Sequence, residues 1–274
     1  MIRIIDTFDK IPAFFPEGRF SLSAWKNYAD SISPTLAQKC REDTAFYNFE
    51  TEILPVVEAA LAFSNQLEKA HEAFLKVVDG LQSRIESKLH MDVDADIVLY
   101  LGLCSGAGWA TELDRRPAVL LGLEKIVELD WTDEDSMNGL ILHELGHLLH
   151  FRSRRTPFFD AEAPALWQLY EEGMAMLLEQ ELVGKPEYFH WEKNGWLAWC
   201  RENQTRLFAE YLRRVNALES VQDFFGDWCA FEGKSDVGYF LGAVLCRKLL
   251  DRMSLSDLCN VSSETILKAL GGLS

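Results

Sequence analysis

The chain has 274 residues, and 48% of them are hydrophobic, which is enough to bury a full core and argues against disorder. With 27 basic and 43 acidic residues the formal net charge is −16, so we expect neither nucleic acid nor an anionic membrane as a partner, because so acidic a surface repels phosphate. Six scattered cysteines without a CxxC pair are typical of reduced thiols. Together with the lack of a signal peptide or a membrane-spanning apolar run, this predicts a cytoplasmic protein.

The first third of the chain is predicted to be helical. Over residues 21–90, apolar side chains recur at spacings of three and four with charged residues between them. His71 and His90 fall in this region without partners at metal-ligand spacing, so we expect both to be ordinary surface or packing residues. Residues 1–92 are therefore interpreted as an N-terminal helical region without a recognised motif.

The pattern changes after this region to short apolar segments. ADIVLYLGL (95–103) is β-branched and predicts a strand, CSGAGWAT (104–111) predicts a glycine-containing loop, and PAVLLGLE (117–124) predicts a second strand. Two strands joined by a loop of this length indicate an antiparallel pair. The loop has neither GxGxxG nor GK[ST], so a tight turn is a better interpretation than a phosphate site.

A helix with strong polar groups on an apolar background follows, WTDEDSMNGLILHELGHLLHFRSRR, with Thr132 as the expected N-cap. Inside it His143, Glu144 and His147 form HExxH. Positions four apart share a helix face and lie about 6 Å apart along the axis, so both imidazoles can reach one zinc ion. Glu144 then lies beside the metal as a general base. The alternative is a structural cluster with both histidines salt-bridged to Glu144.

His150 lies on the same face but is not expected to be the third ligand. It is about 10 Å along the helix axis from His143, too far for both to bind one metal at about 2.1 Å. We expect it to support neighbouring residues at the C-terminal end of the helix. The metzincin extension also fails, because it requires glycine at position 150 and histidine at 153, where this chain has Ser153.

The third ligand is expected on a second helix, PALWQLYEEGMAMLLEQELVG, which should begin near Pro164. This helix is apolar almost all round, and its polar stripe consists of Gln168, Glu172 and Glu179. Such a stripe alone would more simply face solvent. Beside an HExxH helix that lacks a third ligand, Glu172 becomes the predicted ligand, whereas Glu171 points about 100° away.

HELGH followed by EEGMA resembles the gluzincin group of zinc peptidases, in which HExxH is followed by a glutamate on a later helix. The gap here, 172 − 147 = 25, is longer than in the best-known members. The chain is also similar to little-characterised bacterial predicted zinc-dependent proteases. In these, strand-like segments precede the HExxH helix and a Gly-Tyr helix follows, here SDVGYFLGAVLCRKLL. The resemblance covers roughly residues 95–252.

The resemblance implies the zinc-binding and catalytic residues of a peptidase: His143, His147 and Glu172 as ligands and Glu144 as the base. It also implies that Tyr239, preceded by Asp236 as the expected N-cap, donates to the oxyanion of a tetrahedral intermediate, although a core tyrosine is an equally good interpretation. The Gly-Ala-Met-Glu-Asn motif of related aminopeptidases is missing, so aminopeptidase activity is not expected. Position 176 is Met where thermolysin-like enzymes have an acid, and Glu179 could replace that acid as partner of a histidine.

We therefore expect an α+β fold that is predominantly helical, with a zincin-like core of a small antiparallel sheet, the HExxH helix and the glutamate-bearing helix. Residues 93–274 form the catalytic region with a helical C-terminal part, in one compact unit with the N-terminal helices. The expected activity is zinc-dependent hydrolysis of a peptide or protein, with 117–124 as the edge for an extended substrate. The alternatives are a structural or regulatory zinc protein without turnover and a zinc hydrolase of a non-peptide amide or ester.

Overall fold

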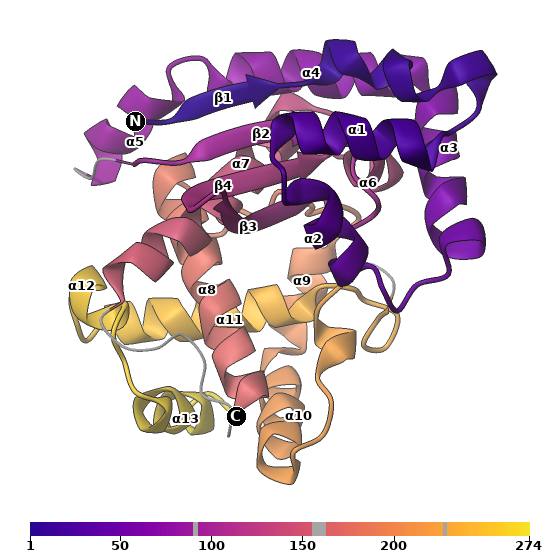
Figure 1. The fold of residues 1–274 in the computed structure, drawn as a ribbon. Coiled ribbons are helices and arrows are strands. Elements are labelled where there is room, and N and C mark those ends of the chain that lie inside the picture. The colour runs from indigo at the N-terminus through magenta and orange to yellow at the C-terminus, as the bar shows by residue number, and fades with distance from the viewer. Residues whose placement is uncertain (90–92, 155–162, 227–228) are drawn as a thin grey trace. The chain divides into compact units, whose positions relative to one another are not determined.

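The computed structural model divides into two compact units, Met1–Leu148 and Leu149–Ser274 (Figure 1). This division falls within the HExxH helix rather than near residue 92, where the change of sequence pattern suggested a boundary. The structure describes four segments of the chain: residues 1–89, 93–154, 163–226 and 229–274. Among these residues, no helix has the length and apolar character needed to cross a lipid bilayer.

Helices dominate the first unit and confirm the helical prediction for the part of residues 21–90 that the structure describes. The interpretation of residues 1–92 as entirely helical is wrong at its start, where Arg3–Asp6 is a strand. The apolar spacing of the sequence becomes a buried face, as in α4 (Ser64–Val78), where Leu67, Ala70, Phe74 and Val77 are buried on one side. The remaining helices are α1 (Leu22–Ile32), α2 (Leu36–Asp43), α3 (Leu54–Ala62), α5 (Leu81–Leu89), α6 (Leu123–Glu128) and α7 (Glu134–Ser153), with short 3-10 helices at Phe8–Phe14 and Pro16–Gly18 and a π-turn at Phe49–Ile53.

The sheet of this unit has four strands in the order β1-β2-β4-β3 and is mixed. β1 (Arg3–Asp6), β2 (Asp96–Tyr100) and β4 (Arg116–Gly122) are parallel, and β3 (Gly108–Leu113) runs antiparallel to β4. In Figure 1 the four strands follow one another in this order, with α1 in front of the sheet. The α+β class and the predominance of helix are confirmed.

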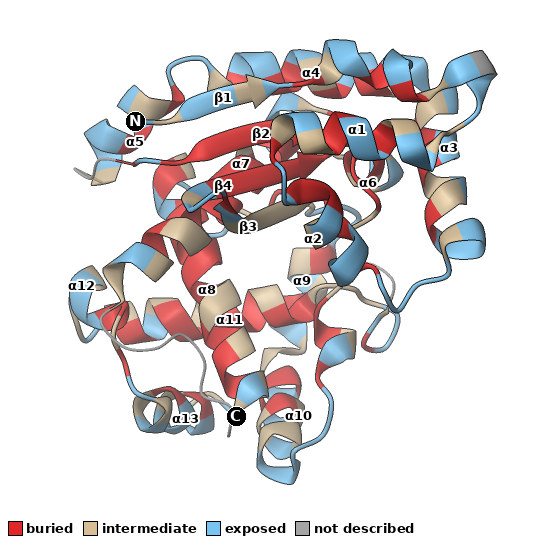
Figure 2. Cartoon of the chain, in the orientation of Figure 1, coloured by how far each residue is buried: buried red, intermediate tan, exposed pale blue. Residues whose placement is uncertain are grey.

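The prediction of a small antiparallel sheet is wrong, and the prediction of a loop over 104–111 is wrong in its second half, which belongs to β3. The strands predicted at 95–103 and 117–124 are β2 and β4, which pair in parallel. Their unbroken apolar sequence is typical of parallel strands covered on both faces, and Figure 2 shows both as buried. β1 and β3 are largely exposed or half-buried and carry no such signal.

The loop that follows β2 is held by a buried carboxylate. Gly102 and Cys104 donate their backbone N–H groups to Glu124 of α6, at 2.6 and 2.9 Å. Burial raises the pKa of the Glu124 carboxyl, against the lowering effect of these two hydrogen bonds. The N–H groups that would have to bind a phosphate therefore already bind the protein's own carboxylate, which agrees with the interpretation of this segment as a tight turn.

The second unit is helical. α8 (Pro164–Val183) starts at the proline predicted to begin it and ends at Gly184 in the left-handed conformation (φ 82°). It crosses α11 (Val237–Leu250) at two glycines, since a Cβ on Gly173 would lie 2.3 Å from the carbonyl oxygen of Gly242. The two backbones therefore touch. The other helices are α9 (Trp196–Glu202), α10 (Gln204–Ala217), α12 (Leu255–Leu258) and α13 (Ser263–Gly271).

Two residue types singled out in the sequence have ordinary structural roles. The six cysteines are all described and none forms a disulfide, in agreement with the expectation of reduced thiols. The His71 ring stacks on Phe8 at 4.1 Å, and its Nε2 lies 2.6 Å from the Asp6 carboxylate, so this histidine is a packing residue as predicted. His90 lies outside the described residues.

Candidate metal centre

The helix that carries HExxH is anchored at its start by an aspartate. Asp133 accepts the backbone N–H of Ser136 at 2.9 Å through Oδ1 and its hydroxyl at 2.9 Å through Oδ2. The expected cap, Thr132, instead donates its hydroxyl to Gln66 Oε1 at 3.2 Å. Threonine and aspartate are both good N-caps, and only the position of the first turn decides between neighbours. The prediction was therefore wrong by one residue.

His143 and His147 share one face of α7, as their spacing predicts. His143 is buried and His147 is half-buried. Their ring centroids are 4.9 Å apart and the rings are inclined at 85°. Two imidazoles at this separation, held by one rigid helix turn, are able to present a nitrogen each to a common point.

Glu172 of α8 completes a candidate metal site with these histidines. Each of the three residues offers one ligand atom, and these atoms lie within 4.8 Å of one another. Ligand atoms about 2.1 Å from one tetrahedral zinc ion are roughly 3.4 Å apart, so small side-chain movements suffice for binding. Two imidazoles and a carboxylate are the donor set of many catalytic zinc sites and also suit other divalent transition metals. The residues present therefore fit a metal ion.

The carboxylate of Glu144 is held against the sheet. Its Oε2 accepts the backbone N–H of Ala110 in β3 at 2.8 Å. A Cβ on Gly108 would lie 2.6 Å from Oε1 and 2.7 Å from Cγ of the same side chain, so only glycine permits this approach. Glu144 is 8% exposed. The Glu144 carboxylate is therefore bonded to the backbone of β3. This differs from the alternative in which both HExxH histidines form salt bridges with Glu144.

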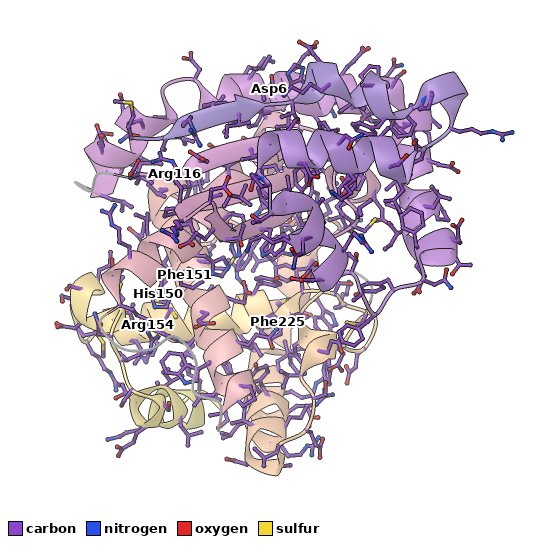
Figure 3. The ribbon with its side chains drawn as sticks, viewed as in Figure 1. Asp6, Arg116, His150, Phe151, Arg154 and Phe225 are labelled. Carbon is purple, nitrogen blue, oxygen red and sulfur yellow. The ribbon has the colours of Figure 1, made fainter. Side chains whose placement is uncertain are left out.

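His150 contacts α8 through a tyrosine. Its Nε2 lies 3.2 Å from the hydroxyl of Tyr170, and the two rings meet edge to face at 5.1 Å. The Tyr170 hydroxyl donates in turn to the carbonyl of Leu258. One turn further on, the Arg154 guanidinium lies 3.9 Å above the ring of Trp167. Figure 3 labels His150 and Arg154 at this end of the helix. The last turn of α7 thus packs on α8, which agrees with a supporting role for His150.

Glu179 has a histidine partner that the sequence did not indicate. It is fully buried, and its Oε1 lies 2.9 Å from Nδ1 of His190, whose side chain is also buried. Glu179 was expected to be the partner of a histidine, and that histidine is His190, which is not one of the predicted metal ligands. Because His190 stands in FHWEK without a helical or metal-ligand spacing, no local signal could have indicated it.

Tyr239 lies in the first turn of α11, half-buried. Its ring packs edge to face against Trp191 at 5.1 Å and Phe225 at 5.4 Å. Asp236 precedes the helix in the left-handed conformation (φ 62°) and accepts the backbone N–H of Gly226 at 3.0 Å instead of capping with its side chain. The aromatic contacts are those of a packing residue, and a catalytic role for the hydroxyl stays a prediction.

Comparison of the chain with protein-family models, with curated proteins and with solved structures finds no match in any of the three.

Proposed function

We propose that this chain is a zinc-dependent hydrolase with a zincin-like catalytic region, and most simply a peptidase of the gluzincin type. The observation that carries the proposal is the proximity of one ligand atom each from His143, His147 and Glu172, all within 4.8 Å. Glu144 follows the first of these ligands directly in the helix. Three protein ligands leave one position of a tetrahedral ion for water, which distinguishes catalytic from structural zinc sites.

A zinc ion bound here would acidify a water molecule and polarise a substrate carbonyl group. Glu144 would accept the proton of that water and return it to the leaving amine. The Glu144 carboxylate is nearly buried, which favours this role because proton transfer is then shielded from bulk solvent. Tyr239 is proposed as a hydrogen-bond donor to the oxyanion.

The proposed substrate is an extended peptide that adds to the edge of the sheet. The edge strand next to Glu144 is β3. The prediction that residues 117–124 form this edge is wrong, because β4 is paired on both sides, with β2 and with β3. A strand paired on both sides has no backbone groups left for a substrate. The outward N–H of Ala110 is bonded to Glu144, so a substrate would pair with the other outward groups of β3, which would bring a scissile bond past the HExxH helix.

The first test is the metal content of the wild-type protein, Glu172→Ala and Glu171→Ala, measured by elemental analysis after zinc reconstitution. One zinc per chain in the wild type and in Glu171→Ala, with loss in Glu172→Ala, is expected, because only Glu172 belongs to the ligand group. Glu171 is the matched control, since it is the adjacent half-buried glutamate of the same helix. Absence of metal from the reconstituted wild type would refute the proposal.

The second test is hydrolysis of a quenched-fluorescent peptide library by the zinc-loaded protein. Glu144→Gln is expected to keep its zinc and to lose turnover by at least about 100-fold, since a general base contributes roughly that much or more. A Gln variant as active as the wild type would refute the role of Glu144. Zinc without turnover on peptides, esters or other amides would favour a structural role, and turnover of only a non-peptide ester or amide would replace the peptidase assignment.

A further inference from the structure

The backbone of β3 has a row of groups that point away from the rest of the sheet. Gly122 donates its N–H to the carbonyl of Ala107 at 3.0 Å, so these two residues form a hydrogen-bonded pair of the antiparallel ladder. Such pairs alternate along the ladder with pairs whose N–H and C=O groups point outward. In this register the outward-pointing residues are Gly108, Ala110 and Glu112.

One of these outward groups binds Glu144. The N–H of Ala110 donates to Oε2 at 2.8 Å, which is a charge-assisted hydrogen bond to an almost buried carboxylate. Two residues earlier, Gly108 leaves room for the side chain, because its missing Cβ would lie 2.7 Å from Cγ of Glu144 and 2.7 Å from Cδ1 of Leu140. The strand thus contacts the glutamate at two successive outward positions.

We infer that β3 positions the Glu144 carboxylate, with Ala110 and Gly108 as positioning residues. A glutamate side chain has several rotatable bonds, and the hydrogen bond from Ala110 together with the wall at Gly108 restricts them. A general base must stay within hydrogen-bond distance of the proton it removes, and a displacement of about 1 Å can cost about 100-fold in rate. The inference deepens the proposed function and rests on it for the catalytic consequence, whereas the contact itself stands on geometry within the first unit.

The contact can be tested without metal or substrate by amide hydrogen exchange. In the wild type the amide of Ala110 is expected to be protected, because its hydrogen is bonded to Glu144. In Glu144→Ala its exchange rate should rise at least about tenfold, while the amide of Glu112, which also points outward in β3, should keep its rate. Equal exchange rates of the Ala110 amide in the two proteins would overturn the inference, whether or not the protein is a hydrolase.

The catalytic consequence is tested by a matched pair of proline substitutions, Ala110→Pro and Glu112→Pro. Proline removes the N–H at either site, and because both point outward, no hydrogen bond between β3 and β4 is lost. Only the first substitution removes a donor to Glu144. On the best peptide of the library, Ala110→Pro is expected to lower kcat about 10- to 100-fold with zinc per chain unchanged. Glu112→Pro should raise KM, because it removes a backbone donor from the edge proposed to pair with the substrate, and should keep kcat within about threefold of the wild type.

Equal losses of kcat in the two proline variants would overturn the positioning role, since the shared cost of proline would then explain both. A wild type that binds zinc and hydrolyses nothing would refute the proposed function, and the exchange experiment would still decide whether β3 holds Glu144. Gly108→Ala provides a second route, because the added methyl pushes on the side chain without removing the donor. It should lower kcat in the same way, and an unchanged kcat would count against the inference.

Discussion

Replacing Gly173 by alanine is expected to destabilise the second unit by about 2 kcal/mol. The new Cβ would lie 2.3 Å from the carbonyl oxygen of Gly242, 2.5 Å from its carbonyl carbon and 2.8 Å from its Cα. Since favourable contacts begin at about 3.5 Å, α8 and α11 would have to separate by roughly 1 Å. The cost of overpacking should lie at the upper end of its usual range, about 3 kcal/mol, because the Gly242 backbone cannot rotate away from the new methyl group. The better helix propensity of alanine offsets about 1 kcal/mol of this cost.

The assay is equilibrium urea unfolding followed by circular dichroism and tryptophan fluorescence. With a denaturant dependence of about 2 kcal/mol per molar urea, the midpoint of the second unit should fall by roughly 1 M. Gly271→Ala is the control, because this glycine ends α13 and a Cβ there would meet no heavy atom within 4 Å. It should be neutral or stabilise by up to about 1 kcal/mol. A Gly173→Ala protein as stable as the wild type would refute the close crossing of the two helices.

Three further substitutions test buried or capping polar groups by urea unfolding. Burial raises the pKa of Glu124, so the folded state holds the carboxyl proton more tightly, and the wild type loses stability as pH rises through the folded pKa. The free energy of unfolding of Glu124→Gln relative to the wild type should therefore increase from about pH 4 to about pH 8, and a constant difference would contradict this. Asp133→Ala should cost about 0.5–2 kcal/mol at pH 7. The pKa of Asp133 is lowered, because the hydrogen bonds from Ser136 outweigh burial, so this cost should shrink as pH falls below about 4; a cost that persists there would refute the cap. Tyr170→Phe removes the hydroxyl next to His150 and should cost about 1–3 kcal/mol, and an unchanged midpoint would show that this contact is unimportant.

Helices were the part of the fold that could be predicted from the sequence. The spacing of Leu67, Ala70, Phe74 and Val77 is set by the 3.6-residue turn, so periodicity alone shows which face is buried. Strand pairing was not predictable in the same way. β1 has four residues, lies at the sheet edge and joins β2 across about 90 residues of chain, which leaves no local trace. The predicted strands β2 and β4 do pair, but the antiparallel prediction failed because it took the segment between them as a single turn. That segment contains β3, so the chain reverses direction twice and β2 and β4 run parallel.

In the candidate site, too, the residues that lie within one helix turn could be predicted and the contacts between distant residues could not. HExxH was readable because its three residues are brought together by one helix turn, and the geometry follows from the helix alone. Glu172 could be predicted only from the narrow polar stripe on an otherwise apolar helix. In the structure its ligand atom lies within 4.8 Å of those of the two histidines. The pairing of Glu179 with His190 could not be predicted, because the partner of a buried carboxylate depends on which hydrogen-bonding group the folded chain places beside it.

By itself the sequence determined that His143, Glu144 and His147 occupy adjacent positions on one helix and that α8 begins at Pro164, because helical geometry and helix starts depend on residues within a turn or two. Only the tertiary structure decided that the strand beside Glu144 is β3 and that its Ala110 amide is the partner of that carboxylate. That contact joins residues 34 positions apart through a backbone group, and every residue except proline carries the same N–H. No side-chain pattern can therefore reveal such a partner before the chain is folded.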